Sequence, residues 1–251
     1  MDFQIGDVVN RTFGAISRNF VTFFLLSAVL VGIPTLVFGL AQYSLMSSGP
    51  GGWVLWGLAI LVNLAAAYVL QGALVHGAVT DFNGGRASFN ACLSTGLKHM
   101  VPLVVIALLM SLGIMLGMVL LIVPGIILSI MWIVALPARV VENTGITESF
   151  GRSRDLTRNN RWKIFGLFVI YIILATVISM LVMLPVGAAG YSAGQSGAIG
   201  AGSASIIAVV FNVIATVLTA IVSAAGVSAI YFELRKSKEG VGAEALAKVF
   251  E

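Results

Sequence analysis

Charge is scarce in this sequence, and the places where it is missing decide the class of protein. Only 14 of the 251 residues are Lys or Arg, and only 10 are Asp or Glu. Three runs contain none of these residues: Asn19–Thr80, His99–Ala138 and Ile164–Phe232. A charge at the centre of a bilayer costs ~2.5–3.5 kcal/mol, and a spanning helix needs about 20 mostly apolar residues. Each run is therefore long enough for two spans, and the sequence predicts an all-α, polytopic membrane protein with six transmembrane helices in three hairpins.

The residues of catalytic and metal sites are equally scarce. Cys92 is the only cysteine, so the chain cannot form an intramolecular disulfide or a cysteine-based metal cluster. The two histidines, His76 and His99, do not stand at a metal-ligand spacing, and the charge-free runs contain no carboxylate. Because an enzyme needs a general acid, a general base or a metal, we expect no catalytic activity, no cofactor and no metal. Cys92 is expected to be a small buried side chain.

Turn residues divide the charge-free runs into spans at about 20–43, 53–79, 101–122, 125–141, 164–186 and 205–231. Ser47–Gly52 separates the first pair and Pro124-Gly125 the second. The segment Gly187–Ser205 separates the third pair and contains six glycines and no charge. We expect it to be a flexible outer loop, with a re-entrant segment as the alternative.

The position of the cations predicts the orientation in the membrane. If the N-terminus is cytoplasmic, six spans return every charged segment to the same side, and all Lys and Arg satisfy the positive-inside rule. The first span is too long for the apolar part of a cleaved signal peptide. We therefore expect a multi-pass membrane protein with cytoplasmic termini. Its net charge of +4 favours anionic headgroups on the cytoplasmic face as partners, and not nucleic acid.

A short amphipathic segment precedes each pair of spans. Apolar residues recur at helical spacing within residues 5–16, 89–97 and 146–156, with polar and charged residues opposite them. This pattern predicts three copies of one unit, at about 3–80, 86–141 and 145–232, related by an axis along the membrane normal. The alternative is that any three hairpins with positive junctions look alike. With either interpretation we expect the chain to be one membrane domain, 1–251, that ends in a cytoplasmic tail at 233–251.

A dense group of cations forms the first candidate site. Near an anionic leaflet each cation is worth ~1 kcal/mol, which is enough to hold the third amphipathic segment at the surface. The sharper hypothesis is a binding site for a lipid headgroup or phosphate. The residues of this group are Arg152, Arg154, Arg158, Arg161, Lys163 and Arg235.

Polar and small residues inside the spans form two further groups. The polar residues Asn63, Gln71, His76 and Asn212 could line a polar path or headgroup groove, or simply form interhelical hydrogen bonds worth ~0.6 kcal/mol each. The small residues let helices approach closely, either within one chain or against a partner helix. These residues are Gly113 and Gly117, which form a Gly-x-x-x-Gly pattern, and Ala208, Thr216, Ala220 and Ala224.

Several motifs give the chain a family resemblance. Pro124-Gly125-Ile126-Ile127 is followed by Val140-Val141-Glu142 and by the basic segment 148–158, and Tyr231-Phe232-Glu233-Leu234-Arg235 precedes Lys238-Glu239-Gly240. Over nearly its whole length the chain resembles the bacterial glycerophosphoryl diester phosphodiesterase membrane-domain family and its stand-alone relatives. The resemblance implies a polytopic inner-membrane protein. The family name derives from members fused to a catalytic barrel, for which this chain has no room, so no residue inherits a catalytic role.

Two functions fit these observations. The first is a non-enzymatic scaffold or accessory subunit of an envelope complex, with a partner membrane protein or a second copy as its partner. The second is a transporter or lipid-handling protein that binds a lipid or small amphiphile between the hairpins. We expect the first, because charge inside the membrane, the usual mark of coupled ion transport, is missing.

Overall fold

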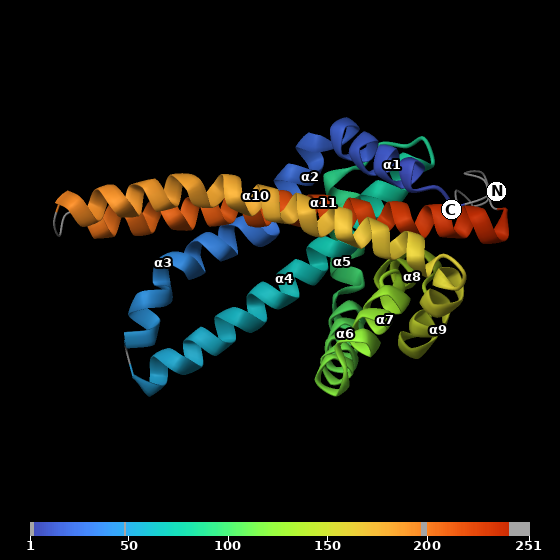
Figure 1. The fold of residues 1–251 in the computed structure, drawn as a ribbon, viewed down its shortest axis with the longest axis horizontal. Helices are drawn as coiled ribbons and strands as arrows, with labels where there is room; N and C mark the ends of the chain where they lie inside the picture. Colours follow the sequence, from blue (N-terminus) through green and yellow to red (C-terminus); the bar gives the residue numbers. More distant parts are fainter. Residues whose placement is uncertain (1–2, 48, 197–199, 241–251) are drawn as a thin grey trace.

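A computed structural model describes residues 3–47, 49–196 and 200–240 of the chain. All regular secondary structure in these residues is helical. A helix of 10 to 14 residues precedes each of three pairs of spanning segments, in the order that the sequence predicts (Figure 1). The first group is α1 (Ile5–Arg18), α2 (Phe20–Ser27), the π-helical turn η1 (Ala28–Gly32), α3 (Ile33–Ser47) and α4 (Pro50–Phe82). The second is α5 (Phe89–Lys98), α6 (Met100–Leu120), α7 (Ile122–Trp132) and α8 (Ala135–Glu142), and the third is α9 (Ile146–Thr157), α10 (Arg161–Ser196) and α11 (Gly200–Glu239).

Six helical segments are long and apolar enough to cross a membrane, which confirms the predicted multi-pass, all-α class. In each segment, no more than a third of the most apolar stretch is buried inside the protein, and in Arg161–Leu181 the buried share is 11%. The remaining apolar surface is available to lipid, as a spanning helix requires. The segments are Phe20–Ala41, Pro50–Phe82, Met100–Leu120, Ile122–Glu142, Arg161–Leu181 and Ala208–Glu239.

Two of the spans are interrupted, and a proline explains each interruption. Pro137 lies in the first turn of α8 and has no N–H to donate to the carbonyl of Ile133. The fourth span therefore breaks between Trp132 and Ala135, where the sequence predicts one continuous helix. Pro34 follows η1 in the same way and removes the donor to the Leu30 carbonyl. A π-helical turn at this place relaxes the first span around the missing hydrogen bond.

The turns between the spans differ from the prediction in two places. The break in the second hairpin falls at Leu121, and Pro124 and Gly125 lie inside the first turns of α7. The expected loop Gly187–Ser205 is wrong for most of its length, because α10 continues to Ser196 and α11 begins at Gly200. Alanines between its glycines favour helix, and the helical hydrogen bonds satisfy the backbone. Residues 197–199 lie outside the described residues.

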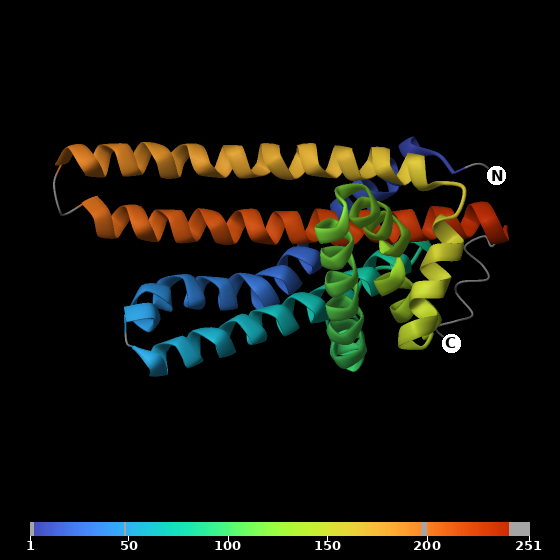
Figure 2. The same ribbon diagram turned by 60° about the horizontal axis from the view of Figure 1, so that its bottom comes forward.

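The charged segments gather at one end of the molecule, which we call the charged end: residues 3–18, 81–98, 139–163 and 233–240. Figures 1 and 2 show α1, α8, α9 and the end of α11 together at this end, while the far ends of α3, α4 and α10 lie opposite. The α6–α7 pair runs across the direction of α10 and α11 in both views. The three hairpins therefore do not share one direction, and the threefold repeat stays a prediction.

The buried core lies at the charged end. Fully buried side chains come from α1, α2, α4, α9, α10 and α11, and include Phe23, Leu74, Leu156, Ile164 and Tyr231. By contrast, the tip of the α6–α7 hairpin is exposed, with Val119 at 78% and Leu120 at 76%. The protein is therefore most rigidly packed where its charged segments meet, and this end holds most of the candidate functional residues.

Candidate functional site

A hydrogen-bonded group at the charged end joins the first and second helices to α4. The Arg18 guanidinium donates to both carboxylate oxygens of Asp81, at 3.0 and 2.6 Å. Asn19 donates to the same carboxylate at 2.8 Å and accepts from the backbone N–H of Ala87 at 3.0 Å. The hydrogen bond to Asp81 raises the pKa of Arg18. This group fixes the turn after α4 against the α1–α2 junction, which is a structural role.

A second group of charged residues at the charged end joins α8, α9 and α11. It includes two of the predicted headgroup ligands. Arg152 donates to Glu142 at 2.7 Å and also pairs with Glu239, which in turn pairs with Arg235 at 2.8 Å. Tyr231 donates to Glu142 at 2.6 Å. Burial opposes the charge on Arg152, but the hydrogen bonds to Glu142 and Glu239 outweigh burial and raise its pKa. Arg152 and Arg235 are therefore occupied by carboxylates of the chain itself.

The other predicted cations fall into two sets. Lys163 donates to the backbone carbonyl of Phe3 at 3.0 Å, so it holds the start of the described chain against α10. Arg154, Arg158 and Arg161 line one open cavity of about 760 Å³, together with Gly151, Asp155, Asn159 and Trp162. Among the described residues, none of these three guanidiniums forms a salt bridge. We call this the rim cavity.

The four polar residues predicted inside the spans also differ in their surroundings. Gln71 and Asn212 line a cavity of about 500 Å³ between α4, α10 and α11, which we call the polar cavity. Asn63 lies outside it and donates to the carbonyl of Ala59 at 2.9 Å, and His76 is half-buried on α4 outside it. The other side chains with hydrogen-bonding groups in the wall of the polar cavity are Tyr68, Tyr171, Ser179, Thr216, Thr219 and Ser223.

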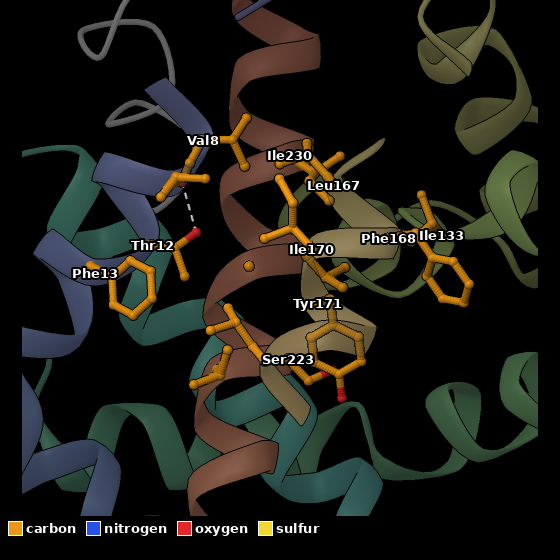
Figure 3. A pocket seen from close by; sticks show the side chains of 15 residues that line it. Val8, Thr12, Phe13, Ile133, Leu167, Phe168, Ile170, Tyr171, Ser223 and Ile230 are labelled. Carbon is orange, nitrogen blue, oxygen red and sulfur yellow. Dashed lines mark hydrogen bonds between the residues drawn. The ribbon is translucent and has the colours of Figure 1, made fainter. Parts of the chain in front are cut away.

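An apolar cavity of about 260 Å³ adjoins the polar one. It lies between α1, α10 and α11, with Ile133 from the break between α7 and α8 (Figure 3). Figure 3 shows Tyr171 and Ser223 at one end of this cavity, and the same two residues line the polar cavity. The two cavities therefore adjoin along the α10–α11 seam, and a single elongated molecule could occupy both.

The small residues have two different surroundings. A Cβ on Gly113 would lie 2.5 Å from the Trp132 ring, and one on Gly117 would lie 3.0 Å from the Gly125 Cα atom. These two glycines therefore permit close packing of α6 on α7 within the hairpin. On α11, Ala224 is buried and Ala208 is half-buried, whereas Thr216 and Ala220 line the polar cavity.

Comparison with known proteins now adds to this geometry. The family model described as the membrane domain of glycerophosphoryl diester phosphodiesterase matches residues 98–243, more than half of the chain. The chain belongs to this family. The membrane-domain match contains α6 to α11, and so the rim cavity and the Arg152 group, while Asp81 and Gln71 lie outside it. Comparisons with curated proteins and with solved structures found no match.

Among the described residues, no group of three His, Cys, Asp or Glu side chains could hold a metal ion. The pairing residues that the sequence analysis did not single out are the acids Asp81, Glu142, Glu233 and Glu239. Each lies at the end of a span next to a basic segment. This position is the sequence feature that could have predicted their ion pairs. Glu233 is 3% exposed and pairs with Arg11, whose guanidinium lies 4.7 Å from the Phe232 ring centre.

Cys92 gives a direct test of the packing of α5. Its side chain is fully buried, as predicted, and burial raises the pKa of the thiol to about 11. Because only the thiolate reacts, roughly one molecule in a thousand is reactive at pH 8. We expect N-ethylmaleimide to label the folded protein very slowly, and to label it fully after denaturation in SDS. A Cys92→Ser/Ser94→Cys variant, with an exposed thiol on the same helix, should react while folded. Equal labelling rates for the two folded proteins would contradict the buried position of Cys92.

Proposed function

We propose that this membrane protein is a non-enzymatic, lipid-handling protein of a bacterial inner membrane, with cytoplasmic termini, that binds an anionic lipid headgroup in the rim cavity. The proposal rests on a difference between the predicted cations: some are paired with carboxylates of the chain, and others face an open cavity. Arg152 and Arg235 are neutralised by Glu142 and Glu239. Arg154, Arg158 and Arg161 face one open cavity, and among the described residues of its wall Asp155 is the only acid.

The rim cavity has the chemistry that a phosphate group requires. A guanidinium donates two parallel hydrogen bonds to phosphate oxygens and remains charged at every physiological pH. Trp162, 86% exposed at the first turn of α10, is suited to the level of the headgroups, where tryptophan is enriched. A lipid phosphate at this level could contact the three guanidiniums without losing its hydration entirely. In this orientation the charged end faces the cytoplasm, as the positive-inside rule requires.

Binding is tested by native mass spectrometry of the protein in mild detergent with phosphatidylglycerol, and with phosphatidylcholine as the neutral reference. Arg154→Gln/Arg158→Gln should weaken phosphatidylglycerol binding about 30-fold, because each cation is worth ~1 kcal/mol. The matched control is Arg86→Gln/Lys98→Gln, which removes two exposed cations outside the cavity and should change binding little. If both double variants weaken binding equally, the effect is general surface charge and the rim cavity is not a site.

A scaffold role is a second candidate, supported by the α6–α7 hairpin. This pair runs across the other helices, and its tip, including Leu121 and Ile122, is highly exposed. Such a hairpin offers an apolar face to a partner membrane protein or to a second copy of the chain. Purification in a gentle detergent followed by mass measurement should then find a stoichiometric partner or a homo-oligomer. A clean monomer would count against this role.

A further inference from the structure

The polar and apolar cavities point to a ligand of another kind than the one proposed for the rim. We propose that together they bind an uncharged lipid alcohol of the diacylglycerol type, with its hydroxyl and ester groups in the polar cavity and a hydrocarbon chain in the apolar cavity. This inference goes beyond the headgroup site and does not depend on it, because the two sites share no wall residue.

The depth of the polar cavity excludes a charged ligand. Tyr171, in its wall, follows Arg161 by ten residues, which is about 15 Å along a helix. That distance is half of the ~30 Å hydrocarbon core. The described residues of the wall include no Asp, Glu, Lys, Arg or His, so a phosphate at this depth would lack a counter-charge and would be strongly disfavoured.

The amides in the wall of the polar cavity favour a ligand that can form hydrogen bonds. Within the described residues, the side-chain amides of Gln71 and Asn212 form no hydrogen bond, although both lie in membrane-spanning segments. An amide left unpaired in hydrocarbon costs several kcal/mol. Each amide can donate and accept, and the tyrosine, serine and threonine hydroxyls around them can do the same. Hydroxyl and ester groups match this neutral mixture of donors and acceptors.

The adjoining apolar cavity indicates that the polar group belongs to a lipid. The side chains around it are almost entirely hydrocarbon, including Val8, Leu167 and Ile230. Thr12, one of the polar residues in its wall, already donates to the Val8 carbonyl at 2.7 Å (Figure 3). Apolar cavities of this kind stay dry and accept hydrocarbon. The combined volume falls within the 300–1,000 Å³ that is typical of small-molecule sites, and Tyr171 and Ser223 line both parts.

Photolabelling of the full chain tests the proposal. The protein is reconstituted in phosphatidylcholine nanodiscs with a diacylglycerol whose photoreactive group lies next to the ester bonds, or with a phosphatidic acid that carries the same chains and the same photoreactive group. Diacylglycerol should label α4 and α11 peptides that contain Gln71 and Asn212. Gln71→Leu and Asn212→Leu should each lower this labelling about fivefold, the effect of one lost hydrogen bond. Leucine is well tolerated in spanning helices, so both variants should insert normally.

Asn63→Leu is the matched control, because Asn63 is also an amide on α4 but lies outside the polar cavity. It should leave diacylglycerol labelling unchanged. Equal losses for Gln71→Leu and Asn63→Leu would overturn the proposal, as would the absence of diacylglycerol labelling at α4 and α11. Labelling of these peptides by phosphatidic acid as strongly as by diacylglycerol would also overturn it. Arg154→Gln/Arg158→Gln should not alter diacylglycerol labelling, so failure of the rim site is distinguishable from failure of this one.

Discussion

Replacing Gly96 with alanine is expected to destabilise the protein by about 3 kcal/mol. Gly96 lies on α5 where this helix crosses α4, and a Cβ there would overlap the carbonyl oxygen of Val69 and lie 3.2 Å from the backbone nitrogen of Ala73. Both obstacles are on the backbone of a buried helix turn, so no side chain can rotate away. The helices must separate, and the buried contacts between them are lost. Unfolding in mixed SDS micelles, followed by tryptophan fluorescence, measures the change.

The control is Gly151→Ala on α9. No atom lies within 4 Å of a Cβ at this position, and alanine is favoured over glycine in a helix by about 1 kcal/mol. This variant should therefore be as stable as the original protein or slightly more stable. If Gly96→Ala unfolds at the same SDS fraction as Gly151→Ala, the close crossing of α5 and α4 is incorrect.

The class of protein could be predicted from the sequence because the cost of charge in a bilayer applies to each residue locally. The six spans follow from three charge-free runs, and the short helices α1, α5 and α9 follow from apolar spacing. The breaks were harder to predict. Pro137 interrupts the fourth span through one missing hydrogen bond, and the glycines of 187–205 suggested a loop where α10 and α11 continue. A single proline or glycine is compatible with either a continuous helix or a break. The surrounding residues determine whether the helix continues.

The candidate site required tertiary structure for another reason. The six predicted cations are equivalent in sequence, and only the folded chain shows which of them meet an acid. Arg152 reaches Glu239 across 87 positions, and Arg11 reaches Glu233 across 222. Gln71 and Asn212 were recognisable as polar residues in apolar spans, but their convergence on one cavity depends on how α4 packs against α11. Sequence patterns thus pointed to the candidate residues, and the fold separated those that line cavities from those that pair within the chain.

The Arg18–Asp81 pair gives the second large expected effect, and the two partners should not be equivalent. Asp81 has a side chain that is 4% exposed, whereas that of Arg18 is 60% exposed. Arg18→Met leaves a buried carboxylate with Asn19 as its remaining side-chain donor, and we expect it to cost about 3 kcal/mol. Asp81→Asn leaves a guanidinium that water can solvate and keeps an acceptor for Asn19, so it should cost about 1 kcal/mol. SDS unfolding of both variants measures the difference.

The double variant Arg18→Met/Asp81→Asn separates the pair from its surroundings. Once Asp81 is neutral, removing the guanidinium no longer strands a buried charge. The double variant should therefore be less destabilised than the sum of the single variants, by about 2 kcal/mol. Additive effects, or a larger cost for Asp81→Asn than for Arg18→Met, would contradict the burial of Asp81. Because Asn19 also accepts from the N–H of Ala87, this carboxylate anchors both the α1–α2 junction and the turn that leads to α5. Its loss should loosen the charged end on which the rim cavity is built.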